Sequence, residues 1–215
     1  MTILVTGANR GIGRAILEAA EAAGRSCFGT SRAEPRGGWL KLDVTDPASI
    51  AAAARDWGDE PLRTLVCNAG VYEDKGEALD SGFDADLWAR TFAVNVTGVF
   101  LTIQAFLPMI EAAGGKIAII SSQMGSDTRA PGGSYIYRAS KAAALNLGRN
   151  LAADLYPRGM AVGIYHPGWV QTDMGGGAAD ITVDQSATGL AARFDALSLD
   201  TTGCFETWDG RAHPF

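Results

Sequence analysis

Short apolar runs alternate with stretches of helical periodicity along the chain, and most positions within each run are apolar. Strands that are apolar on successive residues are buried on both faces, which is typical of a parallel sheet covered by helices. We expect strands at 3–5, 26–30, 39–42, 64–67, 116–120, 160–165 and 203–205. The pattern predicts an α/β fold, a doubly wound parallel sheet of about seven strands with helices on both faces.

Helix-forming stretches lie between the expected strands. We expect helices at 12–23, from Pro47 onward, at 84–94, at 99–111, at 137–155 and at 183–196. Asp46 followed by Pro47 marks a helix start, because aspartate caps free N–H groups and proline suits the first helical position. Pro108 should kink its helix or end its regular hydrogen bonding. The segment between the second and third strands is too short for a full crossover helix.

The composition is that of an ordinary globular domain, with 47% apolar and 20% charged residues. We expect one domain spanning residues 1–215. The net charge of −6 disfavours nucleic-acid partners, because an acidic chain repels phosphate backbones. Three separated cysteines and two histidines suggest neither a disulfide framework nor a metal site, which fits a reducing compartment. No leader-like or membrane-like segment precedes the first strand, so we expect a cytoplasmic protein.

A glycine-rich segment separates the first strand from the first helix. Its glycines follow the spacing Gly-x-x-x-Gly-x-Gly, which differs from the common dinucleotide fingerprint and from the Walker loop. Glycines permit a tight turn and close approach of a ligand, and the helix start offers free N–H groups to a pyrophosphate. The alternative is an ordinary glycine-rich turn. The predicted phosphate-binding residues are Gly7, Asn9, Arg10, Gly11, Ile12 and Gly13.

The end of the second strand indicates which dinucleotide is preferred. Sites for NAD place an acidic residue there to bind the ribose hydroxyls. This chain instead has Ser31 and Arg32, with Arg10 in the glycine-rich segment nearby. A guanidinium pairs well with a 2′-phosphate, so we expect NADP(H) as cofactor. The alternative is that Arg32 is a solvated loop residue.

Tyr137 and Lys141 are four residues apart, with Ser121 and Ser122 shortly upstream. On a helix this spacing puts the phenol and the ammonium on one face. A nearby cation lowers the pKa of a phenol, so the pair suits acid/base chemistry. The alternative is a surface helix with an amphipathic tyrosine.

These features together resemble the short-chain dehydrogenase/reductase family, and the matching motifs run in its order along nearly the whole chain. The motifs are Thr6-Gly7-x-x-x-Gly11-x-Gly13, Asp43-Val44, Asn68-Ala69-Gly70, Val94-Asn95-Val96, Ser121-Ser122, Tyr137-x-x-x-Lys141 and Pro167-Gly168-Trp169-Val170-x-Thr172-Asp173. The stretches 138–143 and 166–175 are most similar to C-factor-like and sniffer-like carbonyl reductases. The resemblance implies a Rossmann-type domain that binds NADP(H).

The family's catalytic four correspond to Asn95, Ser122, Tyr137 and Lys141. The resemblance implies that Tyr137 donates a proton to the carbonyl oxygen and that Ser122 hydrogen-bonds that oxygen. Lys141 is expected to make the phenol more acidic and to hold the nicotinamide ribose. Asn95 is expected to anchor a water that relays protons.

Further cofactor contacts are implied at the other matching positions. Asp43 is expected to face the adenine, with Val44 beside it, and Asn68, Ala69 and Gly70 to pass along the adenosine. The residues expected to border the nicotinamide are Pro167, Gly168, Val170 and Thr172.

The resemblance implies an oxidoreductase that transfers a hydride between NADP(H) and a small carbonyl or alcohol substrate. The alternative is an NADP(H)-binding regulatory or signalling protein of the C-factor type with little turnover. The retained catalytic set favours the enzyme, because a sensor does not need it. The family default is a homodimer or homotetramer, and a monomer stays open. The stretch from Met174 to Thr182 is short for a substrate lid.

Overall fold

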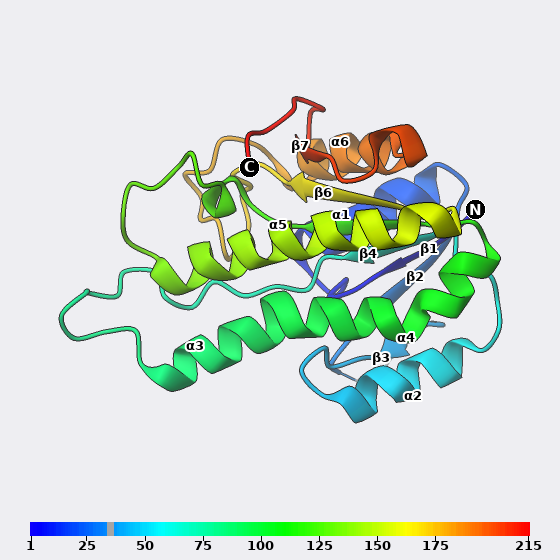
Figure 1. Cartoon of the computed structure of the whole chain (residues 1–215), viewed down its shortest axis with the longest axis horizontal. Coiled ribbons are helices and arrows are strands. Elements are labelled where there is room, and N and C mark those ends of the chain that lie inside the picture. The colour runs from blue at the N-terminus through cyan, green and yellow to red at the C-terminus, as the bar shows by residue number, and fades with distance from the viewer. Residues whose placement is uncertain (34–36) are drawn as a thin grey trace.

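The computed structural model describes residues 1–33 and 37–215. Its strands are β1 (Thr2–Val5), β2 (Ser26–Ser31), β3 (Leu40–Lys41), β4 (Thr64–Cys67), β5 (Lys116–Ile120), β6 (Ala161–His166) and β7 (Phe205–Thr207). They form one sheet in the order β3-β2-β1-β4-β5-β6-β7, and every neighbouring pair is parallel (Figure 1). The predicted fold class is confirmed. The connection between β2 and β3 includes residues 34–36, which lie outside the described ranges.

The helices are α1 (Gly11–Ala22), α2 (Pro47–Trp57), α3 (Ala85–Phe92), α4 (Gly98–Ala112), α5 (Tyr135–Leu155) and α6 (Val183–Ala196). As the sequence indicated, α2 begins with Pro47 after Asp46, whose carboxylate accepts a 2.9 Å hydrogen bond from the Ala48 N–H. Helix α4 continues past Pro108 to Ala112.

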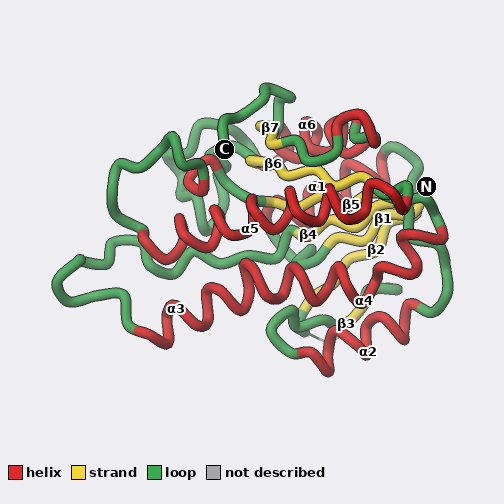
Figure 2. The backbone as a smooth tube through the Cα atoms, in the orientation of Figure 1, coloured by secondary structure: helices red, strands yellow, loops and turns green. Residues whose placement is uncertain are grey.

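Both faces of the sheet are buried, because alternate residues of each strand point to opposite sides. On β5, Ile117 and Ile119 join a cluster with residues of α2, α4 and α5, whereas Ala118 and Ile120 join a second cluster with residues of α1 and α6. Figure 1 shows α2, α4 and α5 in front of the sheet, and Figure 2 shows α1 and α6 on its other side. The two helical layers explain why the strands are apolar on successive residues.

The gap expected between the helices at 84–94 and 99–111 is wrong. A π turn at Ala93–Thr97 joins α3 to α4, so the two form one continuous helical run. Its segment Ala85–Ala112 is long and apolar enough to cross a membrane by length and composition, because an 18-residue window within it has a mean hydropathy of 1.7. Ile103, Phe106 and Ile110 of this run are fully buried against the sheet, and core helices pass the same test.

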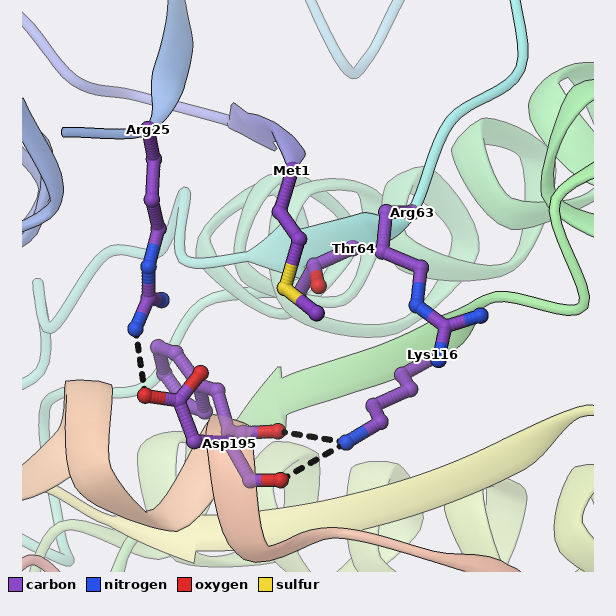
Figure 3. A pocket seen from close by; sticks show the side chains of 7 residues that line it. Met1, Arg25, Arg63, Thr64, Lys116 and Asp195 are labelled. Atoms are coloured by element: carbon purple, nitrogen blue, oxygen red, sulfur yellow. Dashed lines mark hydrogen bonds and ion pairs between the residues drawn. The ribbon is translucent and has the colours of Figure 1, made fainter.

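The amino edge of the sheet is held by basic side chains that bind helix ends. Lys116 Nζ donates to the carbonyls of Phe194 and Asp195 at the end of α6, at 3.3 and 2.8 Å. Arg63 donates to the carbonyls of Ala113 and Gly114 at the end of α4, both at 2.8 Å. Cations at helix carboxyl ends complement the helix dipole. These side chains line a hollow of about 300 Å³, in which Arg25 also pairs with Asp195 (Figure 3).

Strand order reverses beside β1, which has β2 on one side and β4 on the other. At such a switch point the loops after the two central strands diverge and leave a crevice at the carboxyl edge of the sheet. The glycine-rich segment follows β1, and Asn68 follows β4. The fold therefore brings both predicted motifs to the position where doubly wound sheets bind ligands.

Candidate active site

The glycine-rich segment packs tightly against the loop after β4. A Cβ atom at Gly13 would lie 2.4 Å from Asn68 Nδ2 and 2.7 Å from the Gly7 carbonyl oxygen, and Gly7 has a φ of +63°. The Asn68 amide donates to the carbonyls of Thr6 and Gly7, at 2.9 and 3.3 Å. Thr6 Oγ1 accepts from the N–H groups of Asn68 and Ala69, both at 3.0 Å. Through these hydrogen bonds, Asn68 and Ala69 hold the glycine-rich segment in place.

The start of α1 fits a pyrophosphate. Arg10 precedes the helix in an extended conformation, and within the described ranges no side chain caps the free N–H groups of Gly11, Ile12 and Gly13. The first turn contains no acidic residue that would repel an anion. Asn9 and Arg10 are exposed beside it. These residues would hold the phosphates through backbone N–H groups and the positive end of the helix dipole.

The residues predicted to recognise the adenosine end lie beyond β2 and β3. Ser31 is buried at the end of β2, and Arg32 follows it at the surface. Asp43 accepts two hydrogen bonds from Thr45, at 2.9 and 2.7 Å, and these bonds with the Arg32 charge hold the pKa of its carboxyl below the usual value. Val44 lies against α4, since a Cβ at Gly98 would be 2.5 Å from the Val44 carbonyl oxygen. The effect of the Arg32 charge on the pKa of Asp43 indicates that these two side chains are near neighbours.

Tyr137 and Lys141 project from the first turns of α5 toward the end of β5. Ser122, two residues past β5, accepts a 3.1 Å hydrogen bond from the Met124 N–H and lies close enough to the Tyr137 phenol to lower its pKa. Lys141 Nζ lies 5.7 Å from the centre of the Tyr137 ring and donates a 3.0 Å hydrogen bond to the Ile120 carbonyl. Ser121 Oγ donates to the Lys141 carbonyl at 2.9 Å, which ties the end of β5 to the helix. The predicted tyrosine, lysine and serine therefore form one cluster.

Burial dominates the proton equilibria of this cluster. It raises the pKa of Tyr137 to about 12, outweighing the opposite effect of Ser122, while Tyr72 and Asp74 push the pKa in the same direction as burial. It also lowers the pKa of Lys141 to about 8. The pKa of Tyr137 therefore lies above that of an ordinary tyrosine, because desolvation of the phenolate is the largest effect on it.

Asn95 lies in the π turn and clamps the loop after β4 to α5. Its amide accepts from the Val71 N–H at 2.9 Å, and it donates to the Val71 carbonyl at 2.9 Å and to Ser140 Oγ at 3.0 Å. Both amide hydrogens are engaged, so the side chain acts here as a structural clamp. Gly70 lies directly beside it, since a Cβ at Gly70 would be 3.3 Å from Asn95 Oδ1 and 3.4 Å from Lys141 Nζ. The structure therefore places Gly70 beside both Asn95 and the Lys141 amine.

The segment after β6 folds back toward the glycine-rich segment. Thr172 approaches Gly11, where a Cβ would be 3.7 Å from the Thr172 methyl group. The neighbouring Asp173 pairs with Arg10 at 2.7 Å, an exposed ion pair of modest strength. Val170 is buried and bridges to Ile181. The remaining predicted positions are the Pro167 carbonyl, which accepts from Ser186 Oγ at 2.6 Å, and Gly168, whose φ is +90°.

Three side chains at this site escaped prediction as site residues. Thr6 organises the glycine-rich segment, and Ser140 bridges Asn95 to the Tyr137 carbonyl, to which it donates at 2.8 Å. Asp74 binds the start of α5 from a distant loop. Thr6 and Ser140 lie inside the motifs quoted above, so their positions in the sequence could have indicated a role at this site. Asp74 stands in an irregular segment with no sequence pattern around it.

The family model for short chain dehydrogenases matches residues 1–180. The chain belongs to the short chain dehydrogenase family. This confirms the resemblance drawn from its motifs.

Individual members of the family extend the comparison. The C-signal protein of Myxococcus xanthus is 38% identical over 157 residues, which cover 72% of this chain and 93% of that protein. The NADPH-bound carbonyl reductase from chicken fatty liver superposes with a TM-score of 0.90 at 33% identity, covering 100% and 98% of the two chains. The carbonyl reductase Sniffer of D. melanogaster gives 0.94 at 26% identity, covering 100% and 99%. This short chain dehydrogenase is therefore an oxidoreductase by family, similar both to carbonyl reductases and to C-signal.

Proposed function

We propose that this short chain dehydrogenase is an NADP(H)-dependent oxidoreductase that transfers a hydride between nicotinamide and a small carbonyl or alcohol substrate, with Tyr137 as general acid/base. The observation that carries the proposal is the buried cluster of Tyr137, Ser122 and Lys141 at the carboxyl edge of the sheet, beside the glycine-rich segment. We also propose that residues 1–215 act as one dinucleotide-binding domain.

When bound, the nicotinamide supplies the hydride that passes to or from the carbonyl carbon. Negative charge develops on the carbonyl oxygen during reduction, so that oxygen needs a proton donor and a hydrogen-bond donor. Ser122 lies close enough to Tyr137 to affect the pKa of its phenol, so both hydroxyls can address one oxygen atom. A phenol with a raised pKa is protonated at neutral pH, which suits the acid role in carbonyl reduction.

Lys141 supports the phenol electrostatically once Tyr137 has given up its proton. Its ammonium faces the phenol ring, and its lowered pKa allows it to exchange a proton near neutral pH. Asn95 joins the Val71 segment to Ser140 of α5, which preserves the geometry of the cluster.

A preference for NADP(H) over NAD(H) is supported by the charges around the adenosine end. Arg32 follows β2, where an acidic residue would oppose a 2′-phosphate, and Arg10 lies in the glycine-rich segment. A carbonyl reductase of similar structure was crystallised with NADPH.

The alternative function is a regulatory or signalling protein that binds NADP(H) with little turnover, and the similarity to C-signal favours keeping it. Loss of NADPH absorbance, measured over a panel of aldehydes, ketones and diketones, separates the two. We expect turnover of at least one carbonyl by the wild-type chain. Tight NADPH binding without turnover on any of them favours the regulator.

A further inference from the structure

Asp74 is a completely buried carboxylate in an otherwise exposed loop. It lies between β4 and α3, where Glu73 and residues 75–81 are all exposed to solvent, whereas Asp74 is 0% exposed. Burying a charged side chain is unfavourable unless it is paired or hydrogen-bonded. A single buried acid within such a loop therefore calls for a partner inside the protein.

The partner is the first turn of α5. Asp74 Oδ2 accepts hydrogen bonds from the N–H groups of Ile136 and Tyr137, at 2.8 and 3.3 Å. Ser134, which directly precedes the helix, has left-handed backbone angles, and among the described residues its side chain caps no N–H group. The helix that carries Tyr137 is thus capped by a residue more than sixty positions away, where a negative charge also complements the helix dipole.

Two further contacts join the same loop to the same turn. The Tyr72 ring stacks on the Tyr137 ring, with centroids 4.2 Å apart and planes 22° from parallel. The Tyr72 hydroxyl is hydrogen-bonded to Ser134 Oγ at 2.6 Å. Asp74 therefore holds the backbone of the turn while its neighbour Tyr72 holds the ring of Tyr137.

Helix capping alone does not require a carboxylate. An asparagine caps a helix about as well as an aspartate, and it brings no charge into the protein interior. Asp74 keeps a charge there, and its Oδ1 has no hydrogen-bond partner among the described residues. Tyr72 and Asp74 both raise the pKa of the Tyr137 phenol, and Lys141 Nζ lies 5.7 Å from the centre of its ring, so Asp74 supplies the negative charge of this set.

We propose that Asp74 is a positioning residue for Tyr137, which fixes the first turn of α5 and also acts electrostatically on the phenol. This inference rests on the proposed function, in which Tyr137 is the general acid/base. It assigns to Asp74 two separable effects. One stabilises the first turn of α5, and the other alters the release of the Tyr137 proton.

Three variants separate these effects. D74N keeps an oxygen that accepts from the same two N–H groups and removes the charge. D74A removes both. E73Q is the matched control, because it removes one negative charge from the adjacent exposed residue, which is only weakly paired with Arg90 at 3.7 Å. Should D74N not fold, D74S takes its place, since a hydroxyl also accepts from the N–H groups.

The first measurement is independent of turnover. The chain is labelled with 3-fluorotyrosine, whose phenol ionises at lower pH than that of tyrosine, and the ¹⁹F resonances of its five tyrosines are followed against pH. The Tyr137 resonance is assigned from Y137F. We expect it to titrate at least ~0.5 pH unit lower in D74N than in wild type and E73Q, because a negative charge near the phenol has been removed. An unchanged midpoint in D74N overturns the electrostatic part.

The second measurement is hydrogen exchange at the Ile136 and Tyr137 amides. We expect exchange at least about fivefold faster in D74A, and little change in D74N and E73Q. Equal exchange in D74A and wild type overturns the capping part.

The third measurement is the pH profile of kcat/KM for carbonyl reduction with NADPH. We expect its alkaline limb to shift to lower pH in D74N and to stay in place in E73Q. If wild type turns over no carbonyl, the proposed function fails while the first two measurements still decide the role of Asp74. If wild type is active and D74N keeps the wild-type profile, the role assigned to Asp74 fails and the proposed function stands.

Discussion

The Lys141 ammonium donates its 3.0 Å hydrogen bond to the carbonyl of Ile120, the last residue of β5. Both groups are buried, so among the described residues the ammonium has exchanged water for this backbone acceptor and the face of Tyr137. Burial disfavours the charged form of an amine, which is why the pKa of Lys141 falls to about 8.

This lowered pKa makes stability depend on pH. Between about pH 8 and the ordinary lysine value of 10.5, the unfolded chain binds a proton at Lys141 that the folded chain has released. Stability should therefore rise with pH across this window, by up to about 3 kcal/mol, and should lack this gain below pH 8. Urea unfolding at pH 7 to 10 tests this beside Lys141→Met. The free energy of unfolding of the wild type should rise relative to that of the variant as pH increases, because Met does not titrate. A constant difference at all pH values would contradict it.

Replacing Tyr137 by Phe should remove the proton donor without removing bulk. We expect kcat for carbonyl reduction to fall by about 100- to 10,000-fold, with the Kd for NADPH nearly unchanged. Steady-state kinetics and fluorescence titration measure the two effects. Tyr135 lies on the same helix and is 39% exposed, so Tyr135→Phe is the matched control and should retain activity. Full activity of Tyr137→Phe would remove this phenol from the mechanism.

Cofactor choice should depend on Arg32. Arg32→Ser is expected to raise the Kd for NADPH about tenfold or more, because a charge-assisted contact to the 2′-phosphate is lost, and to leave the Kd for NADH nearly unchanged. Exposed Arg55 of α2 provides the control, since Arg55→Ser removes the same charge far from the predicted adenosine site. Equal affinity of the wild type for both cofactors would refute the inference from Arg32.

Gly13→Ala should destabilise the chain. The added Cβ would lie 2.4 Å from Asn68 Nδ2 and 2.7 Å from the Gly7 carbonyl, so the loops after β1 and β4 must move apart. We expect a loss of about 1–3 kcal/mol and weaker NADPH binding. Thermal unfolding and cofactor titration check this beside Gly177→Ala, where nothing lies within 4 Å of the added atom and no loss is expected.

The sequence predicted elements best where local and tertiary signals agreed. β4, β5 and α6 have the expected bounds, because buried apolar runs and a clear helical period leave few alternatives. The π turn at Ala93–Thr97 was not foreseen, since one extra residue in a helical turn leaves no distinct pattern. The expected gap at 95–98 is instead the turn that holds Asn95 against Val71.

For the candidate site, residue types were predictable and their environments were not. Tyr137, Ser122 and Lys141 meet as their spacing indicated. The net shift of the Tyr137 pKa depends on how deeply the ring is covered and on Tyr72 and Asp74, which come from a loop of no regular structure. Contacts between residues 62 or 63 positions apart cannot be read from local periodicity.

Lys116 and Arg63 fasten helices of both layers to the edge of the sheet that faces away from the candidate site. These contacts hold the helix ends to one edge of the sheet, whereas the loops of the candidate site lie at the opposite edge. Substitutions that reshape those loops for another substrate should leave the contacts of Lys116 and Arg63 intact, so the two edges of the sheet can be engineered separately.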